Sequence, residues 1–285
     1  MTTHDATLIG GHGFIGARLH ARLQRDGWSC WLPRRDDPEL WLRPLGHVFH
    51  CAGLTADYAE RPFDTVEAHA SLLNRLLRDA RFDSLVYLSS TRLYDSLGAV
   101  DATEDLPLCL SPDNPRHLYD LSKALGESLC RVAGGGRARV ARLSCVWSDT
   151  ADANGFLPDL LRQVLAGRDP GSAGDAARHL VATSPALARD YVHVDDVVEG
   201  LLHLATHRGF GIYNVAEGQN IDNGRLLAHL GKAGDCELVA TGASEGHATP
   251  RISITRMRDA FGWRPTGVLE RTADLIGRRL ACSPS

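Results

Sequence analysis

The sequence predicts an α/β protein with a doubly wound parallel sheet and a smaller C-terminal α/β lobe. Short apolar runs typical of buried strands alternate with helical patterns over roughly the first half of the chain, as far as Val146. A glycine-rich turn follows the first of these runs, and the regular alternation fades beyond Val146. Strands that alternate with helices form parallel sheets, because each helix carries the chain back to the start of the next strand. We therefore expect one large α/β unit followed by a less regular region.

The expected strands of the large unit are short apolar runs, at residues 6–9, 29–32, 48–51, 84–89 and 140–143. The expected helices between them have apolar residues on one side, at residues 17–26, 66–80 and 119–132. Glycines follow two of these helices, at 27 and at 134–136. Further along we expect a helix at 157–165, a strand-then-helix unit at 191–204, and short strands and helices over 210–285.

The turn after the first expected strand has the sequence Gly10-Gly11-His12-Gly13-Phe14-Ile15-Gly16. Glycine here allows a tight turn, a close approach of the backbone to a pyrophosphate, and tight packing of the helix on the strand. The free N–H groups at the start of the helix then face the phosphates. A glycine-rich turn without a ligand is the alternative, but the strand–turn–helix context favours a dinucleotide site. The expected sheet is therefore of the Rossmann type, and the cofactor-binding residues expected from this turn are Gly10, Gly13, Phe14, Ile15 and Gly16.

The end of the second expected strand indicates which dinucleotide binds. An acidic residue there binds the ribose 2′-hydroxyl of NAD, whereas arginine accommodates the 2′-phosphate of NADP. Here the strand runs into Pro33, Arg34 and Arg35, and a guanidinium suits a phosphate well. Asp36 and Asp37 follow at once, so a small change of register would bring a carboxylate to the ribose. We expect NADP in preference to NAD, with Arg34 and Arg35 as its binding residues.

These observations divide the chain into two expected units. Residues 1–147 together with about 190–205 form the dinucleotide-binding Rossmann domain, and residues 148–189 together with 206–285 form a substrate-binding lobe. Ligands of open α/β sheets bind outside the carboxyl ends of the strands. We therefore expect the lobe to cover those ends.

Tyr119 and Lys123 open one of the expected helices and are the candidate catalytic pair. Their spacing places the phenol and the ammonium on one face of the helix, one turn apart. A free tyrosine, with a pKa of about 10, is a poor base at neutral pH. A nearby lysine and the positive charge of a nicotinamide favour the phenolate and lower that pKa. A surface pair that arose by chance is the alternative, and the upstream glycine turn counts against it.

A third catalytic group is expected at the end of a core strand. Ser89, Ser90 and Thr91 end the apolar run at 85–88, where α/β sheets carry their chemistry. A hydroxyl there would hydrogen-bond the substrate oxygen and share its proton with Tyr119. A turn cap is the alternative role for a serine at this position.

Eight motifs together make the sequence similar to the extended short-chain dehydrogenase/reductase family, the group of nucleotide-sugar epimerases, dehydratases and reductases. The matching segments span almost the whole chain: Ile9–Gly16, His50–Gly53, Tyr87–Tyr94, Tyr119–Lys123, Ala141–Trp147, Arg189–Asp196, Tyr213–Val215 and Phe261–Pro265. The set is specific for the family and not for one substrate.

The resemblance implies a role for each matching residue. Tyr119 would be the general acid/base, Lys123 would lower its pKa and bind the nicotinamide ribose, and Ser90, four residues before Tyr94, would orient the reacting oxygen. Thr91 is the substitute for Ser90 and a substrate contact, and Arg189 would reach a nucleotide phosphate. The resemblance also implies a cofactor loop, Cys51-Ala52-Gly53, and a homodimer formed through two core helices.

Two departures from the family pattern are informative. The sugar dehydratases follow their catalytic hydroxyl with Asp-Glu, whereas Thr91-Arg92 stands here, and arginine cannot serve as that acid or base. A dehydratase is therefore not expected. His69 replaces an asparagine that is usual in the family, and Trp147-Ser148-Asp149 replaces the usual Tyr-Gly-Pro. Both changes bear on the substrate and not on the reaction type.

The leading hypothesis is an NAD(P)-dependent oxidoreductase that acts on a nucleotide-activated sugar, as an epimerase or a ketoreductase. Arg34 and Arg35 favour the reductase, and the motif set favours the epimerase. The alternatives are a reductase of a non-sugar carbonyl compound and a regulatory protein that binds NAD(P) without catalysis. Intact Ser90, Tyr119 and Lys123 count against the regulatory protein.

The composition limits the possible partners and the compartment. A net charge of −4 argues against a nucleic-acid or membrane-surface partner. Seven scattered cysteines without CxxC spacing indicate reduced, mostly buried thiols. The sequence has no 18-residue apolar run, and residues 1–9 lack the features of a signal peptide, so we expect a cytoplasmic protein without a membrane span. No metal site is expected, since His193, Asp195 and Asp196 are better explained by the start of a helix, with an aspartate as its cap.

Overall fold

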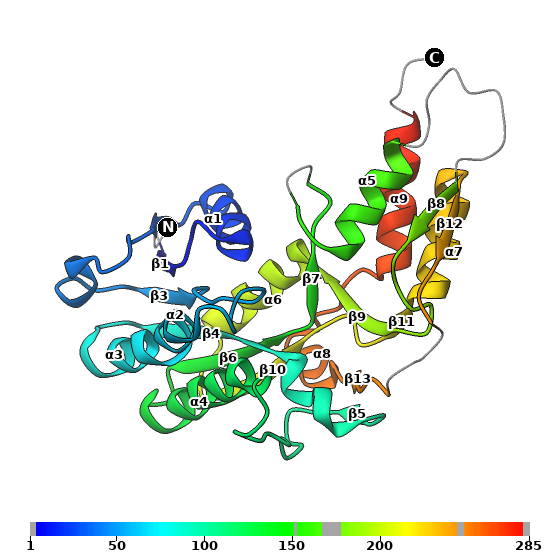
Figure 1. The fold of residues 1–285 in the computed structure, drawn as a ribbon. Helices are drawn as coiled ribbons and strands as arrows, with labels where there is room; N and C mark the ends of the chain where they lie inside the picture. Colours follow the sequence, from blue (N-terminus) through cyan, green and yellow to red (C-terminus); the bar gives the residue numbers. More distant parts are fainter. Residues whose placement is uncertain (1–3, 151–152, 167–177, 244–247, 282–285) are drawn as a thin grey trace.

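A computed structural model of the protein describes residues 4–150, 153–166, 178–243 and 248–281 (Figure 1). No helix in these ranges is long and apolar enough to cross a membrane.

A six-stranded parallel sheet forms the centre of the molecule. Its strands lie in the order β10-β6-β4-β3-β1-β2, and every neighbouring pair is parallel. Their bounds are β1 (Asp5–Ile9), β2 (Ser29–Trp31), β3 (His47–His50), β4 (Ser84–Ser90), β6 (Ala138–Leu143) and β10 (Gly211–Val215). This arrangement confirms the expected Rossmann-type α/β class.

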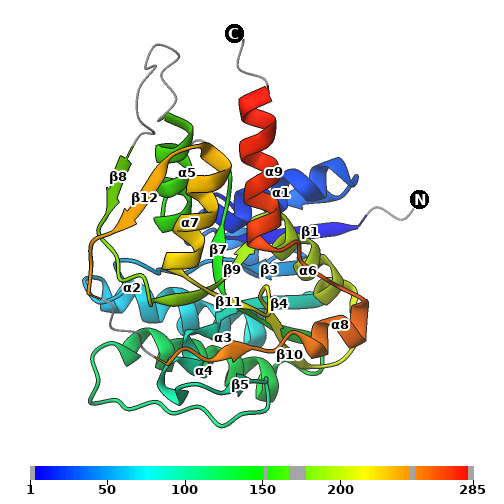
Figure 2. The same ribbon diagram turned by 90° about the vertical axis from the view of Figure 1, so that its right-hand side faces the viewer.

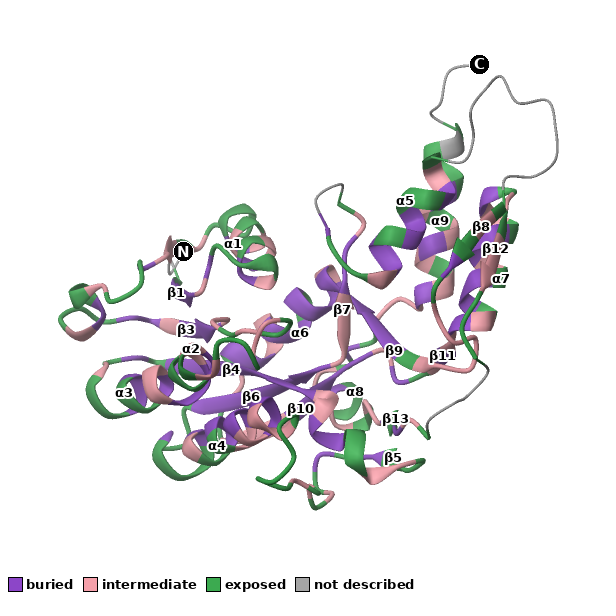
Figure 3. Ribbon diagram, in the orientation of Figure 1, coloured by how far each residue is buried: buried purple, intermediate pink, exposed green. Residues whose placement is uncertain are grey.

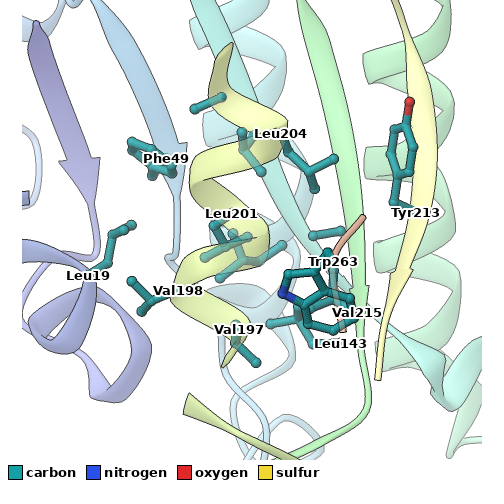
Figure 4. Close-up of a cluster of buried hydrophobic side chains, with 14 of the residues drawn as sticks. Leu19, Phe49, Leu143, Val197, Val198, Leu201, Leu204, Tyr213, Val215 and Trp263 are labelled. Atoms are coloured by element: carbon teal, nitrogen blue, oxygen red, sulfur yellow. The ribbon is translucent and has the colours of Figure 1, made fainter. Parts of the chain in front are cut away.

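Helices cover both faces of this sheet. The helices are α1 (Phe14–Arg25) and α6 (Val194–Thr206) on one face, and α2 (Pro62–Val66), the π-helical turn η2 (Glu67–Ser71), α3 (Leu72–Asp79) and α4 (His117–Ala133) on the other. Successive strand residues point to opposite faces. Leu8 accordingly packs with α1 and α6, whereas its neighbour Ile9 packs with α3 and α4. Figure 4 shows the first of these clusters, with Leu19, Phe49 and Leu201 among its members.

The remaining elements form smaller sheets and a helical group. The strands β7 (Cys145–Trp147), β9 (Ala188–His193) and β11 (Asn220–Asp222) make one sheet, β8 (Arg178–Val181) pairs with β12 (Glu237–Ala240), and β5 (Asp101–Ala102) pairs with β13 (Arg251–Ile252). The helices are α5 (Phe156–Ala166), α7 (Asn223–Gly234), α8 (Thr255–Phe261) and α9 (Val268–Ala281), with 3-10 turns η1 (Pro38–Trp41) and η3 (Thr91–Leu97). Figure 2 shows α5, α7 and α9 side by side, and buried side chains from all three share one core.

Burial follows this layering (Figure 3). Every residue of β4 and of β6 is buried, as expected for strands covered on both faces. The helices bury only their inner sides, so α1 buries Gly16, Leu19 and Leu23 and exposes much of the rest. The main sheet is thus a rigid base for the residues at its carboxyl edge.

Three strands lie on the other side of the expected boundary between the units. The segment 211–215, expected in the lobe, is strand β10 of the main sheet and pairs with β6. Strands β7 and β9, both expected in the Rossmann domain, pair with each other outside that sheet, and β9 also pairs with β11. The reason is that α6 crosses the face of the main sheet and delivers the chain to the edge next to β6. The expected lobe also includes 151–152, 167–177, 244–247 and 282–285, which lie outside the described residues.

Smaller expectations also need correction. The helix expected at 66–80 begins at Pro62 and is interrupted by the π-helical turn η2. The helix after β9 is capped by His193, whose ring nitrogen Nδ1 accepts a hydrogen bond from the backbone N–H of Asp195, and not by an aspartate. The described cysteines are all free thiols, but only Cys130 among them is buried, so the expectation of mostly buried thiols is wrong. Cys282 lies outside the described residues.

Candidate active site

The glycine turn lies between β1 and α1 and packs closely on the chain that follows β3. Gly10 has a φ of 76°, which favours glycine, and a Cβ added there would lie 2.7 Å from the backbone nitrogen of Ala52. A Cβ on Gly16 would lie 2.5 Å from the carbonyl oxygen of Gly10. A side chain at either position would therefore clash with backbone atoms, which explains why both positions are glycine.

Two cavities flank this turn, and Ala52 borders both. The first cavity has a volume of about 530 Å³ and the second about 680 Å³. Residues predicted from the sequence line the first cavity: Phe14, Ile15, Cys51, Ala52, Gly53, Ser90, Thr91, Tyr119, Lys123 and Arg189. Others line the second: Gly10, Gly13, Arg34, Arg35 and Ala52. Gly16 lines neither and packs under the turn instead. A dinucleotide laid across the turn would occupy both cavities, so these residues fit a nicotinamide cofactor.

The second cavity is rich in charged residues. Arg34, Arg35 and Asp36 line it, and Arg35 lies 3.8 Å from the carboxylate of Asp64. Asp37 is absent from its lining, because its carboxylate caps η1 by accepting a hydrogen bond of 3.1 Å from the N–H of Glu39. Only one of the two aspartates considered for the ribose therefore faces the cavity.

Sequence reasoning missed several residues of the second cavity, among them Arg75 and Trp41, which contact each other. Arg75 of α3 lines it, and its guanidinium lies 4.3 Å from the ring centre of Trp41, which also lines it. A third arginine thus joins Arg34 and Arg35. No local pattern marks Arg75, since it is one of two arginines on the amphipathic helix α3.

Tyr119, Lys123 and Ser90 meet at the carboxyl end of β4. Tyr119 and Lys123 lie on one side of α4, and both are buried, with exposed fractions of 4% each. Ser90 ends β4, its hydroxyl accepts a 3.2 Å hydrogen bond from the backbone N–H of Arg92, and it interacts with the phenol of Tyr119 in the direction that lowers the Tyr119 pKa. The ammonium of Lys123 donates a 2.8 Å hydrogen bond to the carbonyl oxygen of Leu88 and lies 5.9 Å from the centre of the Tyr119 ring. The three side chains predicted from separate motifs therefore face one cavity.

Burial controls the pKa values of this pair. Burial lowers the pKa of Lys123 to about 7, because a charged ammonium loses its hydration. Burial also raises the pKa of Tyr119, although the hydrogen bond from Ser90 and the positive charge of Arg92 act in the opposite direction. The expected lowering of the Tyr119 pKa by Lys123 and a nicotinamide stays a prediction for the cofactor-bound protein.

His69, which replaces the usual asparagine, connects the cofactor loop to α4. Its Nε2 accepts a 3.3 Å hydrogen bond from the N–H of Leu54, and its Nδ1 lies 2.8 Å from the hydroxyl of Ser122. The Ser122 hydroxyl donates to the carbonyl oxygen of Tyr119, so Nδ1 must carry the hydrogen of a neutral ring. Burial and Lys123 lower the pKa of His69 to about 2, which agrees with that neutral form.

A buried polar network holds α4 against the sheet. Glu127 accepts a 2.6 Å hydrogen bond from the hydroxyl of Ser89 and two, of 2.9 and 2.6 Å, from the guanidinium of Arg142. Arg142 also donates to the hydroxyl of Tyr94, which in turn donates to the side-chain oxygen of Asn214. The helix that carries Tyr119 and Lys123 is thus fixed to β4, β6 and β10. Sequence reasoning did not find this network, whose members come from five separate segments.

No metal site competes with this assignment in the part of the chain that the structure describes. No three His, Cys, Asp or Glu side chains gather there in a way that could hold a metal ion. His193, Asp195 and Asp149 lie near one another, but Asp195 forms a two-bond pair with Arg18, of 2.5 and 2.8 Å.

Comparisons with known proteins agree with this geometry. Residues 6–216 match the family model described as the NAD dependent epimerase/dehydratase family. The dTDP-4-dehydro-6-deoxy-D-allose reductase of a Streptomyces species is 25% identical over 82% of this chain and 75% of its own length.

Solved structures share the fold over nearly the whole chain. The structure of RMD from Pseudomonas aeruginosa complexed with NADPH has a TM-score of 0.75 and 25% identity, and the match covers 96% of this chain and 98% of that one. MoeE5 in complex with UDP-glucuronic acid and NAD has a TM-score of 0.76 and 20% identity, and the match covers 97% and 99%. These structures include complexes with either dinucleotide.

Proposed function

Since the chain belongs to the NAD dependent epimerase/dehydratase family, we propose that it is an NAD(P)-dependent oxidoreductase that acts on a nucleotide-activated sugar. The observation that carries the proposal is the gathering of Ser90, Tyr119 and Lys123 around the first of the two cavities that flank the glycine turn. The reductase relative and the MoeE5 complex, whose names include a nucleotide sugar, support this class of substrate.

The proposed mechanism assigns one task to each side chain. Ser90 hydrogen-bonds the reacting oxygen of the sugar and holds it beside the phenol of Tyr119, which lines the same cavity. Tyr119 exchanges a proton with that oxygen as general acid/base. Lys123 stabilises the phenolate by its charge and contacts the nicotinamide ribose. A nicotinamide, when bound, supplies or accepts the hydride.

We propose NADP as the preferred cofactor. Arg34, Arg35 and Arg75 line the second cavity, and guanidinium groups suit a 2′-phosphate. Asp37 caps η1 and does not line the cavity. Of the two aspartates that follow Arg35, only Asp36 is therefore placed to bind the ribose 2′-hydroxyl of NAD.

Within this class of oxidoreductase, we propose that the enzyme is an epimerase or a ketoreductase. Arg92 follows Thr91 where the sugar dehydratases have carboxyl groups, so elimination of water has no acid or base at that position. An epimerase returns the hydride to the same sugar, whereas a ketoreductase releases the oxidised cofactor.

The test has two steps. The cofactor that co-purifies is extracted after denaturation, and then a panel of substrates is tested: 4-keto nucleotide sugars are incubated with the protein and NADPH, and UDP- and dTDP-linked sugars with the protein and NAD⁺ or NADP⁺. Stoichiometric loss of NADPH identifies a reductase, and an epimer formed without loss identifies an epimerase. Bound NAD would overturn the NADP proposal. Binding of the cofactor without turnover of any sugar would favour a non-catalytic protein.

Two other expectations are kept as proposals. A homodimer through core helices agrees with the exposure of Leu125 and Val132 on α4, and light scattering would measure it. The division into a Rossmann domain and a substrate lobe, with β10 moved to the former, would be tested by limited proteolysis with and without NADPH.

A further inference from the structure

Arg92 occupies an unusual position at the reacting end of the first cavity. It lies on η3, directly after β4, and lines the cavity beside Tyr119. Its guanidinium carbon lies 4.5 Å from the centre of the Tyr119 ring and 5.1 Å from that of Tyr58. Two aromatic rings therefore hold a cation next to the proposed proton-transfer group.

The charge of Arg92 is only weakly paired within the protein. Its side chain is 30% exposed, and among the described residues the carboxylate within 4 Å of it is that of Asp120, at 3.8 Å. That distance is too long for a hydrogen bond. Its guanidinium also interacts with the hydroxyl of Tyr58 and with the carboxylate of Asp95, which lines the same cavity.

The buried Arg142 shows what a satisfied guanidinium looks like in this protein. Arg142 donates two hydrogen bonds, of 2.9 and 2.6 Å, to the two carboxylate oxygens of Glu127. Arg92 lines the first cavity, and among the described residues no carboxylate accepts two hydrogen bonds from its guanidinium. The planar guanidinium of Arg92 is thus suited to bind a planar anion on a ligand. A partly buried cation is stabilised most by a carboxylate that accepts two hydrogen bonds from it.

We propose that Arg92 binds a carboxylate on the sugar of the substrate, so that the enzyme acts on nucleotide-activated acidic sugars. The inference rests on the proposed function, because it assumes that a nucleotide sugar occupies the first cavity. The nucleotide diphosphate is a second source of negative charge. The sugar is favoured because Arg92 lies over Tyr119, whose hydroxyl must reach the reacting sugar oxygen. Arg189, on β9, lines the same cavity and is the candidate for the diphosphate.

The experiment compares three probes, UDP, UDP-glucose and UDP-glucuronic acid, by calorimetric titration of the full chain saturated with NADP⁺. The wild type should bind UDP-glucuronic acid about 10- to 100-fold more tightly than UDP-glucose, as expected for a charge-assisted two-bond contact. Arg92→Gln should abolish that difference and leave the affinities for UDP and UDP-glucose unchanged. Arg92→Lys, which keeps the charge without the fork, should give an intermediate preference.

A matched control separates Arg92 from a general loss of positive charge. Arg116→Gln removes an exposed arginine at the start of α4 that does not line the first cavity, and should leave the preference intact. Wild-type affinity for NADPH in Arg92→Gln verifies that this variant is folded.

The outcomes distinguish the inference from the proposed function. Equal wild-type affinity for the two sugars would overturn the inference alone. Equal weakening of all three probes by Arg92→Gln would assign Arg92 to the diphosphate and also overturn it. A wild type that binds none of the probes would overturn the inference, and it would overturn the proposed function as well if the dTDP-linked sugars of the panel also fail to bind.

Discussion

The two cavities on either side of the glycine turn are built from different kinds of structure. The first has Ser90, Tyr119 and Lys123 at its reacting end, all buried on β4 and α4 and held by the network around Glu127. The second has Arg34, Arg35 and Asp36 on a loop, all exposed. Buried groups act in a low-dielectric setting with fixed geometry, whereas exposed charges are screened and mobile. Under the proposed function, the reaction would depend on buried core residues, whereas the cofactor preference would depend on exposed residues whose substitution costs little stability.

The largest expected effect is on the first cavity. Tyr119→Phe removes the proposed proton-transfer group and should lower kcat by about 100- to 10,000-fold, measured by NADPH oxidation or epimer formation on whichever sugar the panel identifies. Affinity for NADPH should change little, because the glycine turn is untouched. Tyr213→Phe, on β10 outside both cavities, is the control. Full turnover by Tyr119→Phe would show that the reaction does not occur at this end of the sheet.

The hydrogen-bond network that supports the first cavity can be disrupted at Glu127, which does not line the cavity. Glu127→Gln leaves the buried guanidinium of Arg142 without its anionic partner, and should lower the free energy of unfolding by about 3–5 kcal/mol. Denaturant unfolding measures it. Glu237→Gln, which breaks the exposed pair of Arg178 with Glu237, should leave that free energy nearly unchanged. Similar losses in both variants would remove the contrast between buried and exposed charges.

The pH dependence of stability also tests the difference between buried and exposed charged groups. The pKa of Lys123 is about 7 in the folded protein, against a usual value of 10.5. Between these pH values the unfolded chain binds the Lys123 proton and the folded chain does not, so this residue makes stability rise with pH, by up to about 1.4 kcal/mol per pH unit. Lys123→Met should remove that contribution. Urea unfolding of both proteins from pH 7 to 9 measures the difference, and parallel profiles would contradict a proton loss from Lys123 on folding.

The smallest effect is expected in the second cavity. Arg75→Gln should raise KM for NADPH about 10-fold, the loss expected for one phosphate contact, and leave KM for NADH nearly unchanged. Arg78→Gln is the matched control on the same helix, because Arg78 pairs with Asp79 and does not line the cavity. An equal change for both cofactors would place Arg75 away from the 2′-phosphate.

Much of the site could be predicted because its residues follow local patterns. The glycine turn after an apolar run, the four-residue spacing of Tyr119 and Lys123, and Ser90 at a strand end each depend on a few neighbouring residues. The structure gathers these predicted residues around the two cavities, with Gly16 packed under the turn. Their chemical roles stay predictions that the variants above test.

The sequence by itself determined the α/β class, since strand and helix periodicities are properties of short segments. Only the tertiary structure decided that 211–215 joins the main sheet, that Arg75 stands beside Trp41, that His69 bonds Ser122, and that Arg92 lies over Tyr119. Each of these pairs residues far apart in the chain. Such contacts arise from how helices and strands pack against one another, and no pattern within a single segment encodes that packing.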